Sequence, residues 1–141
     1  MITRKTFSAQ QHDKDDRPAK VVVAGFLVQN WGLIVLEGEQ YDADLVCYRD
    51  GDLKGFVEVE RRHNWVDDFP FQTVHVPARK KKFFTLDKPT TLFSVRSDLK
   101  KALWCPGEVI LSSPIEILKN KHCDSEDFFV VPLDKWKLTD L

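Results

Sequence analysis

Four acidic residues in the first half of the chain stand at alternating positions of two neighbouring segments. Glu58 and Glu60 lie two residues apart in the apolar run FVEVE, and Asp42 and Asp44 have the same spacing in YDADL. Alternate residues of a β-strand point to the same face, and carboxylates are rarely buried unless their charge is compensated. The sequence therefore predicts two pairs of carboxylates, each on one face of a strand.

The turn between the two segments brings these pairs together. It contains the tripeptide DGD, which is a strong hairpin signal. A three-residue loop centred on its glycine places Asp44 opposite Glu58, and likewise Asp42 opposite Glu60. Cross-strand partners have Cβ atoms about 4.5–5.5 Å apart on one face, so four carboxylates converge. A loop of two or four residues would shift the register by one residue and separate Asp44 from Glu58.

Such a cluster of acids has two interpretations. Like charges that face each other destabilise a sheet, so the face is either a wet acidic surface or it holds a cation. Mg²⁺ binds oxygen ligands, commonly one or two carboxylates together with water and substrate phosphate. We favour the metal interpretation because Val46 and Phe56 continue the same face with apolar side chains. The expected cofactor is Mg²⁺ or Mn²⁺.

The composition is that of one globular domain. The chain has 141 residues, of which 43% are hydrophobic and 30% charged. Residues 1–16 lack the apolar core of a secretory signal, and we predict a flexible N-terminal arm at 1–14 and a single domain at 15–141. The three cysteines include no C-x-x-C pair, which indicates reduced thiols in a cytoplasmic protein. The net charge of −1 does not by itself indicate a nucleic-acid binder.

A sheet and covering helices must position the acidic residues. Asp15 and Asp16 ahead of Pro18 indicate a helix start, and the mostly apolar stretch to Trp31 continues that helix. The predicted strands are 33–37, 43–49, 54–61, 90–96, 108–112 and 128–131. Short helices are predicted at 78–84 and 98–103, with a helical turn within 132–138. This order predicts an α/β fold, a mixed β-sheet with a three-strand meander flanked by helices.

The order of Asp44, the hairpin and Glu58-Val59-Glu60 resembles the signature of the PD-(D/E)XK nucleases, which have the restriction-endonuclease-like fold. That signature is an acid on one strand followed by Asp/Glu-x-Lys on the next, and the resemblance covers mainly residues 17–97. It implies that Asp44 and Glu58 bind the metal and that the Val59 main-chain carbonyl adds a ligand. Asp42 is a further candidate ligand.

Glu60 stands where the family usually has its lysine. Because that lysine commonly positions or activates the attacking water, the resemblance implies that Glu60 is a general base or a further metal ligand. Alternatively, a lysine of the next helix supplies the charge, and Lys80 and Lys82 are the candidates. The first helix of the family often contributes a glutamate, whereas residues 17–31 contain no acid.

Basic residues beyond the carboxylates are candidates for contacts to DNA. A bound metal ion can activate water and stabilise charge on a phosphodiester, while cationic side chains hold the polyanionic backbone. The candidates are Arg61, Arg62, Arg79, Lys80 and Lys82. Each could equally belong to a surface salt bridge or a solvated face.

An irregular aromatic segment follows the first basic group. Trp65, Phe69 and Phe71 could stack on unpaired bases. Packing over the open end of the sheet is the more common role of such residues, and it is the interpretation we favour.

Together these features predict a Mg²⁺-dependent endonuclease that hydrolyses phosphodiester bonds in DNA. The family resemblance implies a compact nuclease of a kind that suits a phage or mobile element. Its expected partner is DNA, with no membrane. Because many nucleases of the resembling fold dimerise to cut both strands, the resemblance leaves room for a homodimer. The missing motif lysine favours an alternative, a catalytically inactive nuclease-like module that binds nucleic acid or a protein. The near-neutral net charge favours a third class, a small interaction protein whose acidic face meets a basic partner.

Overall fold

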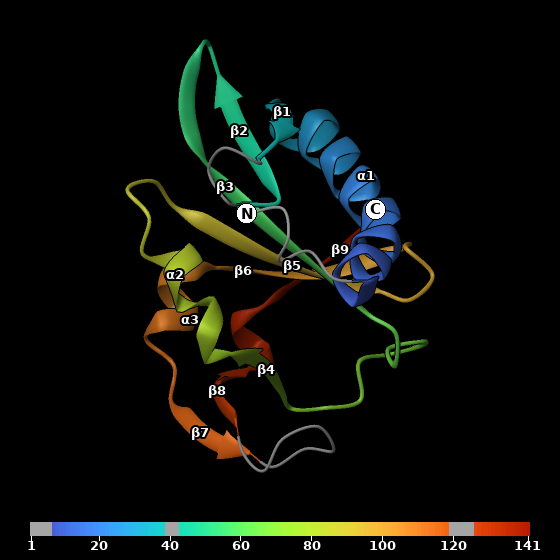
Figure 1. Cartoon of the computed structure of the whole chain (residues 1–141), viewed down its shortest axis with the longest axis vertical. Coiled ribbons are helices and arrows are strands. Elements are labelled where there is room, and N and C mark those ends of the chain that lie inside the picture. Colours follow the sequence, from blue (N-terminus) through green and yellow to red (C-terminus); the bar gives the residue numbers. More distant parts are fainter. Residues whose placement is uncertain (1–6, 39–42, 119–125) are drawn as a thin grey trace.

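The computed structural model describes residues 7–38, 43–118 and 126–141 of the chain. A long helix covers one face of a six-stranded sheet, and a three-stranded sheet with short helices packs on the other face (Figure 1). The predicted α/β class, with a mixed sheet flanked by helices, is therefore confirmed.

The larger sheet contains the predicted meander. Its strands are β1 (Ile34–Glu37), β2 (Leu45–Arg49), β3 (Asp52–Arg62), β5 (Thr90–Arg96), β6 (Lys101–Pro106) and β9 (Lys137–Asp140). They lie in the order β1-β2-β3-β5-β6-β9, and each neighbouring pair is antiparallel except β3 and β5. Parallel strands need a crossover connection, which residues 63–89 provide.

The β2–β3 hairpin reaches the predicted register by a different turn. Asp50 and Gly51 form a two-residue turn with φ angles of 54° and 83°, and type I′ hairpin turns require such positive values. This turn alone would shift the pairing by one residue. A bulge between Cys47 and Tyr48 compensates for the shift, so that Cys47 lies opposite Gly55. From that pair onward the register is the one predicted from a three-residue loop.

The helix α1 (Phe7–Trp31) packs against β2, β3 and β5. Its fully buried face consists of Ala19, Val23 and Leu27. These residues are spaced by four and so share one side of the helix. The helix is longer than predicted, because residues 7–14, which were predicted to form a flexible arm, belong to it. Pro18 therefore lies inside the helix and not in its first turn, and it has no N–H for the backbone hydrogen bond at that position. Within the described residues, no helix combines the length and the apolar content needed to cross a membrane.

Of the strands of the second sheet, the sequence patterns predict only the central one. The sheet contains β4 (Thr73–Pro77), β7 (Ile115–Leu118) and β8 (Glu126–Pro132) in the order β4-β8-β7, with both pairs antiparallel. The strand predicted at 128–131 is confirmed as the centre of β8. Buried residues of β4 and β8 form one cluster with residues of β5 and β6, which joins the two sheets.

Short helical segments connect these strands. They are η3 (Ala78–Lys80), α2 (Lys81–Phe84), α3 (Gly107–Leu111) and η4 (Leu133–Lys135). The first two confirm the helix predicted at 78–84, and η4 confirms the predicted helical turn. The strand predicted at 108–112 is wrong, because these residues mostly form α3, and periodicity alone cannot tell a short apolar strand from a helical turn.

The helix predicted at 98–103 is also wrong. These residues are a turn followed by the first residues of β6. The Asp98 carboxylate accepts hydrogen bonds from the Arg96 guanidinium and from the Lys100 main-chain N–H. Leu99 has a φ of 66°, which a helix does not allow. The aspartate therefore fixes a tight turn between two antiparallel strands.

Candidate active site

Asp44 and Glu58 lie together where the pairing of β2 with β3 ends. The Asp44 main-chain N–H donates a hydrogen bond to Glu58 Oε2 at 2.9 Å, and the Val59 N–H donates to Asp44 Oδ2 at 2.8 Å. Asp44 directly precedes β2. Its carboxylate therefore accepts a hydrogen bond from the Val59 N–H of β3, which lies beyond the last residue pair between the two strands. The structure thus brings together the two residues predicted to form the centre.

Glu58 is buried in the sheet. Only 4% of its surface is exposed, whereas 23% of the Asp44 side chain is exposed. Burial, and after it the negative charge of Asp44, raises the pKa of Glu58 to about 7, since both effects disfavour the ionised form. The surroundings therefore leave the negative charge of this carboxylate incompletely compensated.

Two lysines from other elements approach the pair. Lys20 on α1 places its Nζ atom 3.3 Å from Asp44 Oδ1. Lys80, the last residue of η3, places its Nζ atom 4.0 Å from Glu58 Oε1, and its side chain is 20% exposed. Both lysines lower the pKa of Glu58, but by less than burial raises it.

Of the two lysines predicted as substitutes for the motif lysine, the structure brings only Lys80 to Glu58. Lys82 is exposed, and its Nζ atom lies over the ring of Phe83, 5.1 Å from the centroid. Of the two candidates, Lys80 is therefore the one whose position near Glu58 suits a substitute for the motif lysine.

Glu60 belongs to a separate polar group. Its Oε1 atom lies 3.4 Å from Nη2 of Arg62. Arg62 also donates to the His75 carbonyl at 2.9 Å and to the hydroxyl of buried Ser94 at 3.3 Å. The other carboxylate oxygen of Glu60, Oε2, is buried without a hydrogen-bond partner in the part of the chain that the structure describes. A buried acceptor of this kind is a place where a bound water or ion is expected.

The donor atoms fit a divalent cation held by few protein ligands. Among the described residues, no three His, Cys, Asp or Glu side chains gather as a metal-binding group. Asp44 and Glu58 would be joined by a main-chain oxygen and by water or phosphate, an arrangement that suits Mg²⁺. The N–H and C=O of one strand residue point to the same edge, so the Val59 carbonyl faces the edge where Asp44 lies. Asp42 lies outside the described residues.

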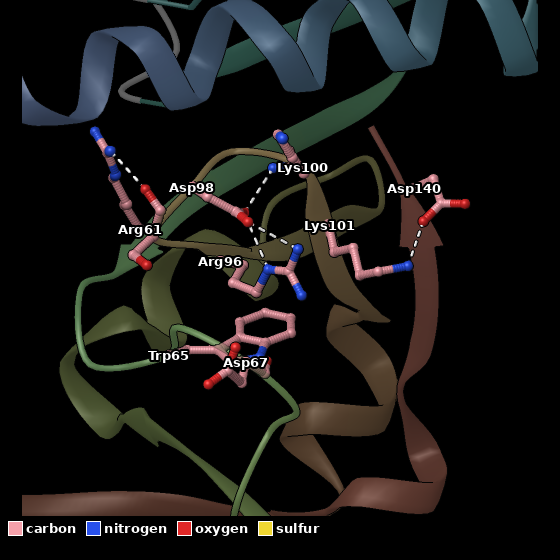
Figure 2. Close-up of polar contacts among 9 residues, drawn as sticks. Arg61, Trp65, Asp67, Arg96, Asp98, Lys100, Lys101 and Asp140 are labelled. Atoms are coloured by element: carbon pink, nitrogen blue, oxygen red, sulfur yellow. Dashed lines mark hydrogen bonds and ion pairs between the residues drawn. The ribbon is translucent and has the colours of Figure 1, made fainter.

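The residues predicted to contact DNA have different surroundings. Arg61 extends toward α1 and donates to the Ser97 carbonyl at 2.6 Å (Figure 2), and Arg62 is held in the Glu60 group described above. Arg79 is exposed and pairs with Glu126 of β8. Arg79 and Lys82 are therefore the members of this set whose exposure suits a contact with an external phosphate backbone.

The aromatic segment divides between core and surface. Trp65 is 3% exposed and belongs to the core cluster between the sheets, and Phe69 packs against that cluster. The favoured packing interpretation is confirmed for these two residues. Phe71 differs, because 62% of its surface is exposed.

Sequence reasoning missed Lys20 and Ser94. Lys20 occupies a polar position of a helix and carries no local signal, because its partner Asp44 is 24 residues away in the sequence. Ser94 did carry a signal, since it is a polar residue inside the buried strand TTLFSVR. It pairs in register with Glu60 across β3 and β5.

The sequence matches no model of a known protein family, and no curated protein is significantly similar to it. The function of the chain is therefore inferred from its residues and their geometry.

Proposed function

We propose that the protein is a divalent-metal-dependent endonuclease that hydrolyses phosphodiester bonds in DNA and has a restriction-endonuclease-like fold. The observation that carries the proposal is the buried carboxylate of Glu58, hydrogen-bonded to the Asp44 main chain and approached by Lys80. The order of elements supports the proposed fold, because a helix, an antiparallel meander and a strand parallel to β3 follow one another.

The chain supplies ligands and a cation for this chemistry. Asp44, Glu58 and the Val59 carbonyl would hold the metal. Bound Mg²⁺ or Mn²⁺ supplies polarisation of the phosphate and a lower pKa of the attacking water. Lys80 carries an ammonium group with three donors, which orients that water and balances charge on the phosphate. Lys20 orients Asp44 through their ion pair.

Glu60 has a second role in this proposal. Its position on β3, two residues beyond Glu58 on the same face, makes it a candidate general base or further ligand. Arg62 fixes the carboxylate through Oε1, and Oε2 has no partner among the described residues. Oε2 is therefore the atom that would accept a proton or a cation.

A cleavage assay tests the proposal. Branched, single-stranded and duplex DNA are incubated with the protein in Mg²⁺, Mn²⁺ or EDTA. We expect cleavage of at least one DNA structure with metal and none in EDTA. Asp44→Asn and Glu58→Gln should abolish cleavage, because each removes a ligand charge but keeps a hydrogen-bond acceptor. Asp52→Asn, at the exposed turn end of the same hairpin, is the matched control and should cleave like the wild type.

A specific observation favours the binding module as a second candidate. Lys20 and Lys80 lie beside the two carboxylates, so their charges are partly balanced by the protein itself. A module of this kind would bind DNA equally well in EDTA and in Mg²⁺. The absence of cleavage for every DNA structure, together with metal-independent binding, would favour it over the nuclease.

A further inference from the structure

An open cleft lies at the end of β3, between that strand and the loop of residues 63–71. Its volume is about 250 Å³, and its lining includes Arg62, Asn64 and Phe71. Pockets for drug-sized ligands have volumes of roughly 300–1,000 Å³. The cleft therefore suits a smaller group, of the size of a single heteroaromatic ring system.

Phe71 is the exposed end of an aromatic series. The ring centroids of Trp65 and Phe69 lie 5.4 Å apart, and those of Phe69 and Phe71 lie 5.8 Å apart. Trp65 is buried, whereas Phe71 is 62% exposed. The series thus anchors an exposed ring to the core.

Hydrogen bonds hold this loop in place. The Trp65 main-chain N–H donates to the Arg62 carbonyl at 3.1 Å, and the Ser97 N–H donates to the Trp65 carbonyl at 3.0 Å. The Trp65 indole N–H donates to the Asp67 carbonyl at 2.6 Å, and Figure 2 shows both residues beneath the Arg96 side chain. The wall of the cleft is therefore formed before any ligand binds.

We infer that the cleft binds one unpaired base of the nucleic-acid strand that is cut, stacked on Phe71. The inference rests on the proposed nuclease function for the nature of its ligand. Arg62, His63 and Asn64 line the same cleft as Phe71, together with the carboxylate of Glu60, so a guanidinium, an imidazole and an amide share the cleft with the exposed ring. Cationic grooves with aromatic rings for stacking are the usual means of binding single strands.

The position of the cleft relates the base to the cleavage site. Glu60 is the lining residue nearest to Glu58 in the sequence, and at about 3.3 Å per residue it lies about 7 Å beyond Glu58 along β3. The base in the cleft therefore belongs to a nucleotide near the scissile phosphate. A base held in this way must leave the duplex stack. The substrate class is nucleic acid with an unpaired nucleotide beside the cut, such as a single strand or a branch.

Binding measurements without metal test this inference. Fluorescence anisotropy in EDTA compares a labelled single-stranded DNA with its blunt duplex. Phe71→Ala should weaken single-strand binding roughly 5- to 150-fold, the range for the loss of one stacked base, and leave duplex binding unchanged. Ile117→Ala is the matched control, because it removes an exposed apolar side chain from β7 in the second sheet, and it should bind both DNAs like the wild type.

An abasic scan identifies the base. Single abasic sites along the oligonucleotide should include one position at which the wild type loses the same factor and Phe71→Ala loses nothing further. Equal losses for single strand and duplex, no loss in Phe71→Ala, or no position coupled to Phe71 would overturn the inference. Since cleavage is not measured, base binding can fail while the nuclease proposal stands, and the reverse.

Discussion

Replacing Glu58 by glutamine should make the stability of the fold less dependent on pH. Glutamine has the same shape, and its carbonyl oxygen can accept the hydrogen bond that the Asp44 N–H donates to Glu58 Oε2. What changes is the charge, because the amide cannot ionise. The difference between the two proteins therefore isolates the cost of the buried carboxylate.

The size of the effect follows from the pKa. Burial and the charge of Asp44 raise the pKa of Glu58 from 4.5 to about 7, so the folded state binds the proton more tightly than the unfolded state. The resulting stabilisation is present in full below pH 4.5 and is lost as the pH rises through 7. Between pH 5 and pH 8.5 this one group should remove about 2.5 kcal/mol from the free energy of unfolding, at about 1.4 kcal/mol per pKa unit.

Urea unfolding in EDTA measures the effect. The free energy of unfolding is determined at pH 5 and pH 8.5 for the wild type and for Glu58→Gln, and the gap between the two proteins should change by about 2.5 kcal/mol in favour of the variant at high pH. Glu116→Gln, at an exposed position of β7, should follow the wild type. Parallel pH profiles for wild type and Glu58→Gln would refute the reasoning.

A bound metal ion should compensate the negative charge of the buried Glu58 carboxylate and so stabilise the fold. At pH 8.5, Mg²⁺ at a hundred times its dissociation constant stabilises by about 2.7 kcal/mol, and Glu58→Gln should gain much less because it lacks the ligand charge. At pH 5 the gain of the wild type should be smaller, since the ion must displace a proton from Glu58. A melting temperature that Mg²⁺ and Mn²⁺ leave unchanged at both pH values would contradict the metal site.

The remaining predictions concern the residues around the pair. Lys80→Met should lower the single-turnover cleavage rate about 10²- to 10³-fold, as removal of one preorganised donor does, and leave DNA affinity nearly unchanged. Glu60→Ala should abolish cleavage and leave DNA binding intact or tighter, because it removes an acid near the phosphate. Glu60→Lys restores the usual family motif, and it should cleave DNA only if the side chain at this position merely holds the attacking water and is not a metal ligand. Arg79→Ala with Lys82→Ala should flatten the salt dependence of duplex affinity by about 0.9 per lost phosphate contact, whereas an unchanged slope would assign both residues to a solvated surface.

The sequence predicted the Asp44–Glu58 pair because the information is local. Alternation along the strands and a strong turn signal place residues on faces without reference to the rest of the fold. The loop length was nonetheless predicted wrongly, and the register survived only because a bulge beside Cys47 offset the two-residue turn at Asp50 and Gly51. Periodicity does not encode a bulge, since one extra residue disturbs the pattern only at its own position.

The surroundings of the pair could not be predicted because they are not local. Lys80 reaches Glu58 only because β4 joins a second sheet and η3 follows it directly. Alternation is present in β4 (TVHVP) and at the start of β7 (IEIL), but a local pattern does not identify the strand with which each one pairs. Because the sequence does not predict how the second sheet pairs, it identifies Lys80 and Lys82 as candidates but does not show which of them reaches Glu58.

The charge balance at the pair distinguishes the nuclease from the binding module. Two lysines stand against Asp44 and Glu58, yet the pKa of Glu58 remains at about 7 because burial outweighs them. An apolar side chain in place of such a buried ionic group would often stabilise the fold equally well or better. The presence of the ionic group therefore points to a functional site. A DNA phosphate at the pair would add a further negative charge beside Glu58. Such a charge raises the pKa of Glu58 further, so phosphate is accepted at this pair when Glu58 takes up a proton or when a metal ion binds. The nuclease therefore predicts phosphate binding at the pair that depends on metal, whereas a module without metal predicts binding there that weakens as the pH rises through 7.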